Sequence, residues 1–388
     1  MPPIARLSAL SSVARAASFV LLAAALVSPG CSSSQPRARV AQDSGDRPYY
    51  VADEGETPPH QRLGYRLEWR GFPFLTEGSE PRFFDVADDV LIFHDSKNNL
   101  TLMENGTGRI RWSTRVGAPL RKFIGNVRAG DNLIVSSETD VQIIDLATGN
   151  LRDRQRLAVL ANTRPAVVSG VAVFGCTTGE VLGHSLLTRY KLWGYALNGV
   201  ITADPVAVRG ADVAVVSQAG DVIIINAETG SAEGRRNAIF DGLSNNPIAD
   251  ERLVYVAGRD QSVWAFDATT GNVRWRLRTE SPITAQPVLH DDRVYITLPR
   301  EGFVALDART GERVWGLDNV TGRVVGVRAG RLLVWSPNRV VLVDPERGEI
   351  VDDLEIPDLA TVVCEPFVDG FLYSVTPEGV VDKFAPLN

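Results

Sequence analysis

Few side chains in this sequence have the types and spacing that catalysis or metal binding requires. The four histidines are His60, His94, His184 and His290. They stand far apart, and none has a second histidine or a cysteine at the spacing of a zinc site. The nucleophile motif Gly-x-Ser-x-Gly and the phosphate-binding loop motif are absent from the sequence. We therefore expect no catalytic residue, no cofactor and no metal site.

Acidic pairs are the remaining candidates for acid–base chemistry or calcium binding. They occur at Asp88-Asp89, Asp291-Asp292 and Asp352-Asp353. The first two occupy equivalent polar turns of a repeat that runs along the chain, and the third follows the last strand of a repeat unit. Acidic residues at turns are commonly solvated and fix the turn itself. This placement favours turn residues over a shared site.

That repeat is a short turn of the type x-Thr-Gly-x, which follows an apolar strand and recurs every 37 to 41 residues. Its last residues are Gly108, Gly149, Arg189, Gly230, Gly271, Gly311 and Gly348. A period of this length is typical of one small β-sheet per repeat and of a propeller. Glycine at the turn favours a positive φ, so Arg189 predicts either a different turn or strain.

Residues 283–318 illustrate one repeat unit. Apolar runs at 283–289, 294–298, 303–306 and 312–317 are separated by turns rich in Asp, Gly and Pro. Runs of four to seven such residues predict four short antiparallel strands.

The strand count predicts how the ring closes. Second strands begin at Val90, Leu133, Val171, Val213, Leu253, Val294, Leu332 and Phe371, which makes eight against seven turns. The last unit lacks its fourth strand, and residues 64–70 resemble one. We predict an all-β, eight-bladed propeller of four-stranded antiparallel blades, closed by an N-terminal strand that completes the last blade. Seven blades with a loose tail are the alternative.

Tryptophans recur in register with the repeat. Trp112, Trp193, Trp275 and Trp315 each follow the last turn residue by four positions, and Trp69 lies in the proposed closing strand. A surface for stacking a ligand is one interpretation. Packing between blades is favoured, because the positions follow the repeat and not a single site. Asp153, Gly234 and Asp352 stand in the other blades, where we expect weaker seams.

The N-terminus indicates export. Arg6 and Arg15 precede the apolar run 16–27, which is too short for a membrane span but suits a signal peptide. Small residues before Cys31 resemble the bacterial lipoprotein box, although Ser28 replaces its usual leucine. We predict a signal peptide at 1–30, lipidation of Cys31, a flexible tether at 31–62 and a propeller at 63–388. Ordinary secretory cleavage is the alternative.

Composition and the other two cysteines indicate no further binding or reactive site. The formal net charge of −7, without a basic run among aromatics, argues against nucleic acid as a partner. Cys176 and Cys364 fall in the third and eighth blades, which are not neighbours, so we expect two core thiols and no disulfide.

The repeat resembles a known family most closely at 265–275 and 305–315. Both segments follow the PQQ-type propeller pattern Ala-x-Asp-x-x-Thr-Gly-x-x-x-Trp. One branch of that superfamily comprises quinoprotein dehydrogenases, which are longer and bind pyrroloquinoline quinone and calcium. The other comprises BamB-type outer-membrane assembly lipoproteins, which are eight-bladed and non-catalytic. This chain is similar to the second branch in length, signal, blade number and lack of catalytic residues.

The resemblance implies a monomeric envelope scaffold, held to the outer membrane by lipid alone and facing the periplasm, that contacts the barrel-assembly machinery. Loops between blades are the expected docking elements. We single out 157–164, with apolar Leu157, Val159 and Leu160 beside Arg164. A quinone-binding or ligand-sensing propeller and a general interaction module of the envelope are the alternatives.

Overall fold

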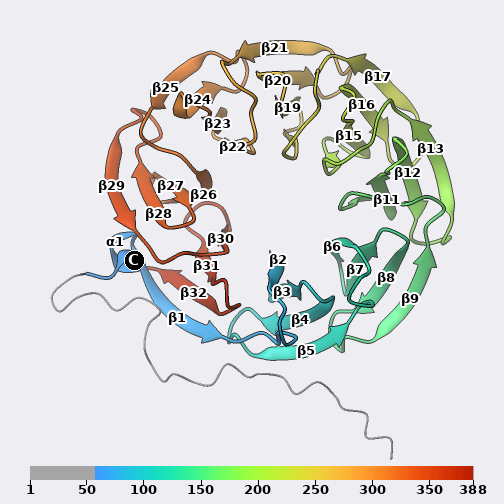
Figure 1. Cartoon of the computed structure of the whole chain (residues 1–388), viewed down its shortest axis with the longest axis horizontal. Helices are drawn as coiled ribbons and strands as arrows, with labels where there is room; N and C mark the ends of the chain where they lie inside the picture. The colour runs from blue at the N-terminus through green and yellow to red at the C-terminus, as the bar shows by residue number, and fades with distance from the viewer. Residues whose placement is uncertain (1–56, 388) are drawn as a thin grey trace, which may run out of the picture. The chain divides into compact units, whose positions relative to one another are not determined.

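The computed structural model describes residues 57–387, which form a ring of eight antiparallel sheets (Figure 1). We number the sheets as blades I to VIII in chain order, and the strands in each blade run from the inside of the ring to its rim. The predicted all-β, eight-bladed propeller is confirmed.

Blades I to IV contain the following strands. Blade I holds β2 (Pro81–Ala87), β3 (Val90–Asp95), β4 (Asn99–Glu104) and β5 (Ile110–Arg115); blade II holds β6 (Phe123–Ala129), β7 (Asn132–Ser137), β8 (Asp140–Asp145) and β9 (Leu151–Arg156). Blade III holds β10 (Ala166–Val168), β11 (Val171–Gly175), β12 (Glu180–Ser185) and β13 (Lys191–Ala196); blade IV holds β14 (Val206–Ala207), β15 (Asp212–Val216), β16 (Asp221–Asn226) and β17 (Ala232–Asn237).

Blades V to VIII complete the ring. Blade V holds β18 (Ile248–Ala249), β19 (Leu253–Gly258), β20 (Ser262–Asp267) and β21 (Val273–Arg278); blade VI holds β22 (Val288–His290), β23 (Arg293–Leu298), β24 (Gly302–Asp307) and β25 (Arg313–Leu317). Blade VII holds β26 (Arg323–Arg328), β27 (Arg331–Ser336), β28 (Arg339–Val343) and β29 (Ile350–Glu355); blade VIII holds β30 (Thr361–Glu365), β31 (Phe371–Val375), β32 (Val381–Pro386) and β1 (Tyr65–Gly71).

The ring closes where its two ends pair. β1 runs antiparallel to β32, with Tyr65 opposite Pro386 and Gly71 opposite Val381. In Figure 1 the blue β1 therefore lies beside the red β32 and forms the outermost strand of blade VIII. This confirms the predicted closure by an N-terminal strand.

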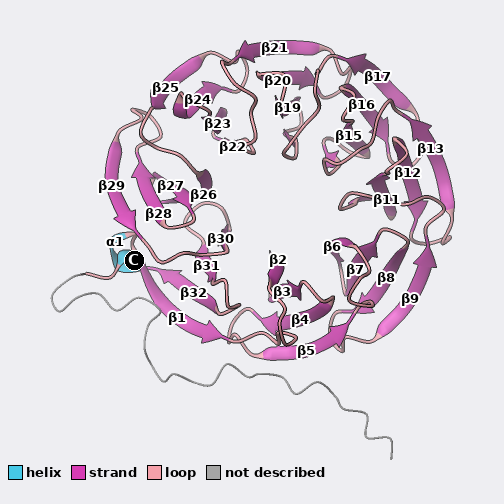
Figure 2. Ribbon diagram, viewed as in Figure 1, coloured by secondary structure: helices cyan, strands magenta, loops and turns pink. Residues whose placement is uncertain are grey.

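One short helix precedes β1. α1 (Pro59–Arg62) is the only helix among residues 57–387 (Figure 2). It lies in the last part of the predicted tether, 31–62, and Leu63 immediately after it is buried. The remaining N-terminal predictions, which are the signal peptide 1–30, Cys31 and tether residues up to 56, lie outside the described residues.

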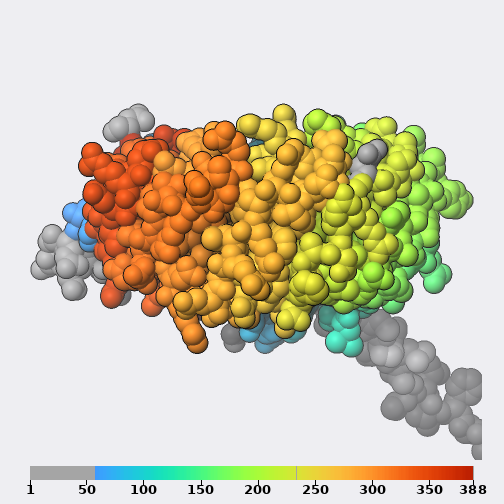
Figure 3. All heavy atoms as spheres, turned by 90° about the horizontal axis from the view of Figure 1, so that it is seen from above, coloured from blue at the N-terminus to red at the C-terminus, as the bar shows by residue number. Residues whose placement is uncertain are grey.

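The hydrophobic core is divided among the contacts between blades, which we call seams. Residues 57–387 form eight buried clusters, and each is built mainly from two neighbouring blades. The side view in Figure 3 shows successive blades standing side by side along the rim in chain order. Because the second and third strands are covered by blades on both sides, their sequences are nearly continuous apolar runs. The fourth strands lie at the rim and alternate between exposed and covered residues.

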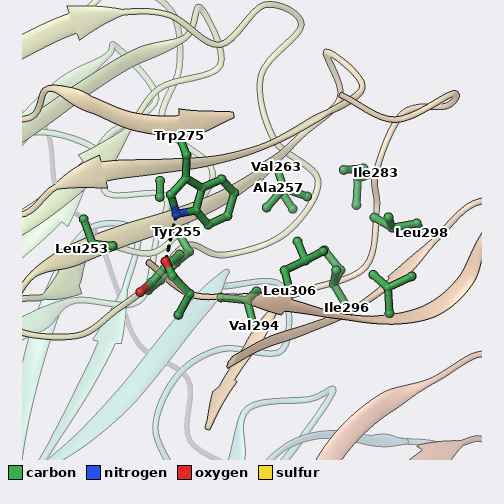
Figure 4. Packing of buried hydrophobic residues seen from close by; sticks show 13 residues of the cluster. Leu253, Tyr255, Ala257, Val263, Trp275, Ile283, Val294, Ile296, Leu298 and Leu306 are labelled. Atoms are coloured by element: carbon green, nitrogen blue, oxygen red, sulfur yellow. Dashed lines mark hydrogen bonds between the residues drawn. The ribbon is translucent and has the colours of Figure 1, made fainter. Parts of the chain in front are cut away.

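The seam between blades V and VI shows how a cluster is built. Figure 4 shows Trp275 and Tyr255 from blade V facing Val294, Ile296 and Leu306 from blade VI. Side chains from both sheets interdigitate, so neither blade buries its inner face alone.

The repeated turns follow the predicted mechanism. Asp267 Oδ1 accepts hydrogen bonds from the backbone N–H of Thr269 at 3.1 Å and of Thr270 at 2.7 Å. Burial of this carboxyl raises its pKa, but the bonds from Thr270 and Arg274 outweigh that effect and hold the pKa of Asp267 at about 2. The ionised carboxylate therefore fixes the turn.

Arg189 adopts the same turn as the glycines it replaces. Its φ is +68°, and its backbone N–H bonds to Ser185 O at 2.9 Å, as Gly149 bonds to Asp145 O. Of the two predicted outcomes the structure shows strain, because a side chain at positive φ is disfavoured.

Candidate functional site

The five repeat tryptophans lie at seams between blades. Each indole ring covers the turn glycine of the next blade, and its Nε1–H donates to the carbonyl three residues before that position. The pairs are Trp69 with Gly108, Trp112 with Gly149, Trp193 with Gly230, Trp275 with Gly311 and Trp315 with Gly348. A Cβ at any of these glycines would lie within 2.6 Å of the ring. The rings are therefore used in packing between blades and not in a ligand site.

The seam between blades II and III replaces the indole with polar groups. Gln155 Nε2 donates to Leu186 O at 2.9 Å, the same carbonyl position that receives an indole N–H elsewhere. Asp153, at the tryptophan position, pairs with Arg189, at the glycine position, over 3.1 Å. His184 Nε2 and Gln155 Oε1 are 2.8 Å apart. Since the Gln155 oxygen can only accept, His184 carries its proton on Nε2.

The seams between blades IV and V and between blades VII and VIII also lack a tryptophan, and other groups take the place of its ring. Gly234 has a φ of +63° and brings its backbone against Gly271, so backbone contact replaces the ring between blades IV and V. Asp352 in blade VII pairs with Arg62 of α1, and Leu63 joins the cluster between blades VII and VIII. The helix thus fills part of the space that a tryptophan occupies elsewhere.

His94 is buried between blades I and II without a hydrogen-bond partner at either ring nitrogen among the described residues. Its ring stacks on Phe123 with centroids 3.8 Å apart and lies 5.8 Å from Phe83. Burial, with a smaller contribution from Arg82, lowers the pKa of His94 to about 4, and only Asp95 opposes this. The imidazole is therefore neutral at pH 7.

The burial of His94 predicts that the folded propeller loses stability at acidic pH. Its pKa is about 4 when folded and 6.5 when exposed, so the unfolded chain binds more protons between these values. Stability should therefore fall as the pH drops from 6.5 to 4, by about 3 kcal/mol from this residue. Urea unfolding at several pH values measures the slope, and His94→Leu should flatten it. His290→Leu, at a partly exposed histidine, is the control; an unchanged slope in His94→Leu would contradict the assignment.

Residues 57–387 contain no cluster of three or more His, Cys, Asp or Glu side chains that could hold a metal ion. Cys176 and Cys364 are buried free thiols, and burial raises the pKa of both. Of the acidic pairs, Asp88-Asp89 engages Arg128, whereas Asp352 and Asp353 pair with Arg62 and Arg339. The pairs thus take part in separate surface ion pairs.

The loops that join one blade to the next all emerge on one face of the ring, because each blade has four antiparallel strands. We call it the interblade-loop face. On the loop predicted for docking, Leu157 is buried and Val159 is packed against the same cluster. Leu160 is 49% exposed. The structure therefore leaves Leu160 as the apolar residue of this loop that a partner can reach.

Arg164 anchors the loop inside the ring. Its guanidinium lies 3.3 Å from the Asp85 carboxylate of blade I, and it passes over Gly125 of blade II. A Cβ at Gly125 would lie 2.5 Å from the Arg164 side chain, so glycine is needed there. Arg164 is thus a bracing residue across three blades.

A ladder of hydrogen bonds continues from Arg164 around the inner rim. Asp204 accepts from the Arg164 backbone at 2.9 Å, and Asn246 accepts from the Asp204 backbone at 2.9 Å. All three residues stand two positions before the first strand of their blade. Burial raises the pKa of Asp204, while bonds from Arg164 and Asn246 oppose the shift. The ladder holds the loops of blades III to V in fixed positions.

Two further apolar residues on this face were missed by sequence reasoning. Leu120, between blades I and II, is 100% exposed, and Phe240, between blades IV and V, is 68% exposed. The available signal was a large apolar residue beside Pro119 or before Asp241-Gly242, within a predicted loop. Leu120, Leu160 and Phe240 together form what we call the apolar loop tips.

The sequence profile of a family described as outer membrane protein assembly factor BamB matches residues 69–277, 177–318 and 236–358. These overlapping matches cover more than half of the chain. The chain belongs to the BamB family. The recognised resemblance is therefore confirmed.

The individual proteins to which this chain is similar share little sequence identity with it. The outer membrane protein assembly factor BamB of Bordetella pertussis is 26% identical over 238 residues, which is 56% of this chain and 60% of the relative. A tetrathionate hydrolase of Acidianus ambivalens is 23% identical over 196 residues, which is 44% of this chain and 32% of that enzyme. The chain thus spans less than two thirds of each of these relatives.

The ring of this BamB-family chain also resembles a solved structure. BamB from Moraxella catarrhalis superposes with a TM-score of 0.63 at 17% identity, over 78% of this chain and 93% of that one. Identity this low supports the shared fold alone. Among residues 57–387, no helix is both long enough and apolar enough to cross a membrane.

Proposed function

We propose that this protein is a non-catalytic scaffold of the bacterial cell envelope with a BamB-like role in outer-membrane β-barrel assembly. It is exported, lipid-anchored through Cys31 and exposed to the periplasm. Its ring docks protein partners, among them components of the barrel-assembly machinery. Family membership and the absence of a metal cluster from the described residues support this proposal.

The observation that carries the proposal is the set of apolar loop tips on a braced face. Exposed aromatic and aliphatic side chains on loops are groups that a protein partner can bury as anchors. Leu120, Leu160 and Phe240 project from loops of different seams, and the ladder from Arg164 through Asp204 to Asn246 links the loops that carry Leu160 and Phe240. Such preorganisation lowers the entropic cost of docking.

Substitution of the apolar loop tips tests docking. The triple variant Leu120→Ser, Leu160→Ser and Phe240→Ser should retain its fold but lose partner recovery about tenfold or more, as loss of interface anchors does. Crosslinking in intact cells, purification from membranes and identification of the partners measure this. Leu187→Ser is the matched control, because Leu187 is exposed on a turn of the opposite face. If the parent protein, the triple variant and the Leu187→Ser control recovered equal amounts of barrel-assembly components, docking through this face would be refuted.

The anchor has its own test. Cys31→Ser should move the protein from the membrane fraction to the soluble periplasmic fraction, because no lipid could be attached. Fractionation followed by immunoblotting measures the change, and Cys176→Ser, at a buried thiol, is the control. A Cys31→Ser protein that stays with the membrane would contradict lipid anchoring.

An enzymatic or ligand-binding role is the second candidate, and the partial similarity to a tetrathionate hydrolase favours it. Titration of the purified protein with pyrroloquinoline quinone and calcium addresses the quinoprotein form of this alternative. Saturable binding with dye-linked oxidation would replace the scaffold proposal. A third role, an envelope interaction module outside barrel assembly, would follow if crosslinking recovers other envelope proteins.

A further inference from the structure

Asn105 joins blade I to blade VIII at the seam where the ring closes. Its side-chain Oδ1 accepts a hydrogen bond from the Tyr373 hydroxyl at 2.7 Å, and its Nδ2 donates to Asp88 O at 2.7 Å. Its backbone carbonyl accepts from the Trp69 indole at 3.0 Å and from Lys383 Nζ at 3.1 Å. This residue therefore receives three hydrogen bonds from blade VIII, the blade that both ends of the propeller share.

Asparagine occupies this turn position only in blade I. The equivalent residue is apolar in the other six repeat turns, where it is Leu146, Leu186, Ala227, Ala268, Ala308 or Pro345. A backbone carbonyl is sufficient to bind the indole of the preceding blade, as it does at Ala227 and Ala308. The Asn105 side chain is therefore not required for that contact, and its amide adds a bond to Tyr373 together with a reactive group.

The residue after Asn105 makes its amide reactive. Gly106 is exposed, and a Cβ at this position would have no atom within 4 Å. Among residues 57–387, no acceptor is hydrogen-bonded to the Gly106 backbone N–H. Asparagine is a thermolabile residue, and a following glycine accelerates its deamidation because no Cβ hinders approach of the glycine nitrogen to the side-chain carbonyl. Asn105-Gly106 therefore has the chemistry of a deamidation site.

Deamidation at this pair is a ring closure followed by hydrolysis. A bond forms between Gly106 N and Asn105 Cγ, and the bond between Cγ and Nδ2 breaks. The amide nitrogen leaves as ammonia, which takes the proton from Gly106 N, and a succinimide remains. Water then opens the succinimide at one of its two carbonyl groups and gives aspartate or isoaspartate. Nothing is oxidised, and water is the only co-reactant.

The closed ring protects Asn105 from this reaction. Its two side-chain hydrogen bonds hold the amide toward Tyr373 and Asp88 O, whereas the attack requires the side chain to rotate toward Gly106 N. The reaction therefore needs a local opening of the seam, and such openings occur continually in native proteins. In isoaspartate the main chain runs through Cβ and Cγ, and the former backbone carbonyl becomes a free carboxylate. The carbonyl position that binds Trp69 and Lys383 is then lost from the main chain.

We propose that Asn105-Gly106 is a deamidation site, that the closing seam controls its rate, and that its product weakens closure of the ring irreversibly. A transient opening between blades VIII and I is thereby converted into a permanent covalent change. Protein that has been folded for a long time then differs from newly made protein at the one seam where both ends of the propeller meet.

Incubation of the purified protein at neutral pH tests whether the seam controls the rate. Tyr373→Phe removes the hydroxyl that holds Asn105 Oδ1 and should accelerate deamidation about fivefold, the effect of one lost hydrogen bond on an opening equilibrium. Tyr255→Phe is the matched control, because it loses a hydroxyl bond to Asp250 inside blade V and should keep the parent rate. Mass spectrometry of the peptide that contains residue 105 measures the conversion of amide to acid.

Two references calibrate these rates. The chain unfolded in urea gives the rate of Asn105 without protection, and the exposed pair Asn198-Gly199 gives the rate at a second Asn-Gly site in each sample. Equal rates at Asn105 in the parent and in Tyr373→Phe would overturn control by the seam. If Asn105 stayed unmodified in Tyr373→Phe while the unfolded chain reacted, the site itself would be refuted.

The consequence for the ring has a separate test. Asn105→Ala cannot deamidate, and it introduces the residue that Ala268 provides at the same position of blade V. After long incubation the parent should show a lower thermal midpoint, whereas Asn105→Ala should keep the midpoint of its fresh sample. Asn198→Ala is the control and should age like the parent. If most of residue 105 were converted and the thermal midpoint of the parent did not change, weakening of the closure would be disproved.

Discussion

Deletion of Tyr65 to Arg70 is expected to open the ring, to lower the thermal midpoint and to convert the protein to oligomers. The deletion removes the partner of β32 and leaves that strand as an unpaired edge. It also removes Tyr65, which is fully buried, and Trp69, whose indole donates to Asn105 O of blade I at 3.0 Å. Size-exclusion chromatography with light scattering, together with thermal unfolding, measures both effects.

Trp69→Ala is the matched control for this deletion. It removes the contact with Gly108 but keeps the pairing of β1 with β32. Asn105 still binds Lys383 and Tyr373 of blade VIII, so the seam between blades VIII and I stays closed. We expect the control to be destabilised yet monomeric. A deletion variant that is monomeric and as heat-stable as the parent would refute closure by the shared blade.

Trp275→Ala is expected to lower the free energy of unfolding by about 3–5 kcal/mol, the usual cost of truncating a buried tryptophan. The ring is buried against Gly311 and bonds to Ala308 O at 2.9 Å (Figure 4). Its loss leaves a cavity in the cluster shared by blades V and VI and an unpaired carbonyl. Urea unfolding followed by circular dichroism measures the change.

Leu187→Ala is the comparison for Trp275→Ala, since Leu187 is 87% exposed. Substitutions at such positions usually alter stability by less than about 0.5 kcal/mol. If the two variants unfolded at the same urea concentration, the Trp275 indole would not stabilise the seam between blades V and VI.

The fold was predictable because the same physical requirement recurs in every blade. All eight observed second strands begin within one residue of the predicted positions, since a polar turn precedes a continuous apolar run each time. The first strands were less predictable. Residues 283–289 were expected to form one, but the strand is Val288–His290. Pro287 lacks a backbone N–H and limits pairing before that point.

The candidate site was less predictable than the fold. Leu157 and Leu160 look alike in the sequence, and only the path of the loop buries the first and exposes the second. The role of Arg164 depends on Asp85, which is 79 residues away in the sequence. No local sequence pattern predicts that pairing. The helix α1 was hidden in a polar segment, because four residues give no measurable periodicity.

The division of the core into eight seam clusters has a consequence for mutational tolerance. Each cluster is built mainly from the sheets on either side of it, and the clusters of distant seams, such as V–VI and II–III, share no side chains. Energetic effects at sites without shared partners add almost independently. One sector can therefore accumulate substitutions, including new loop chemistry, without compensating changes in the opposite sector. A ring of this kind can diversify piecewise, and low overall identity between relatives is compatible with a conserved architecture.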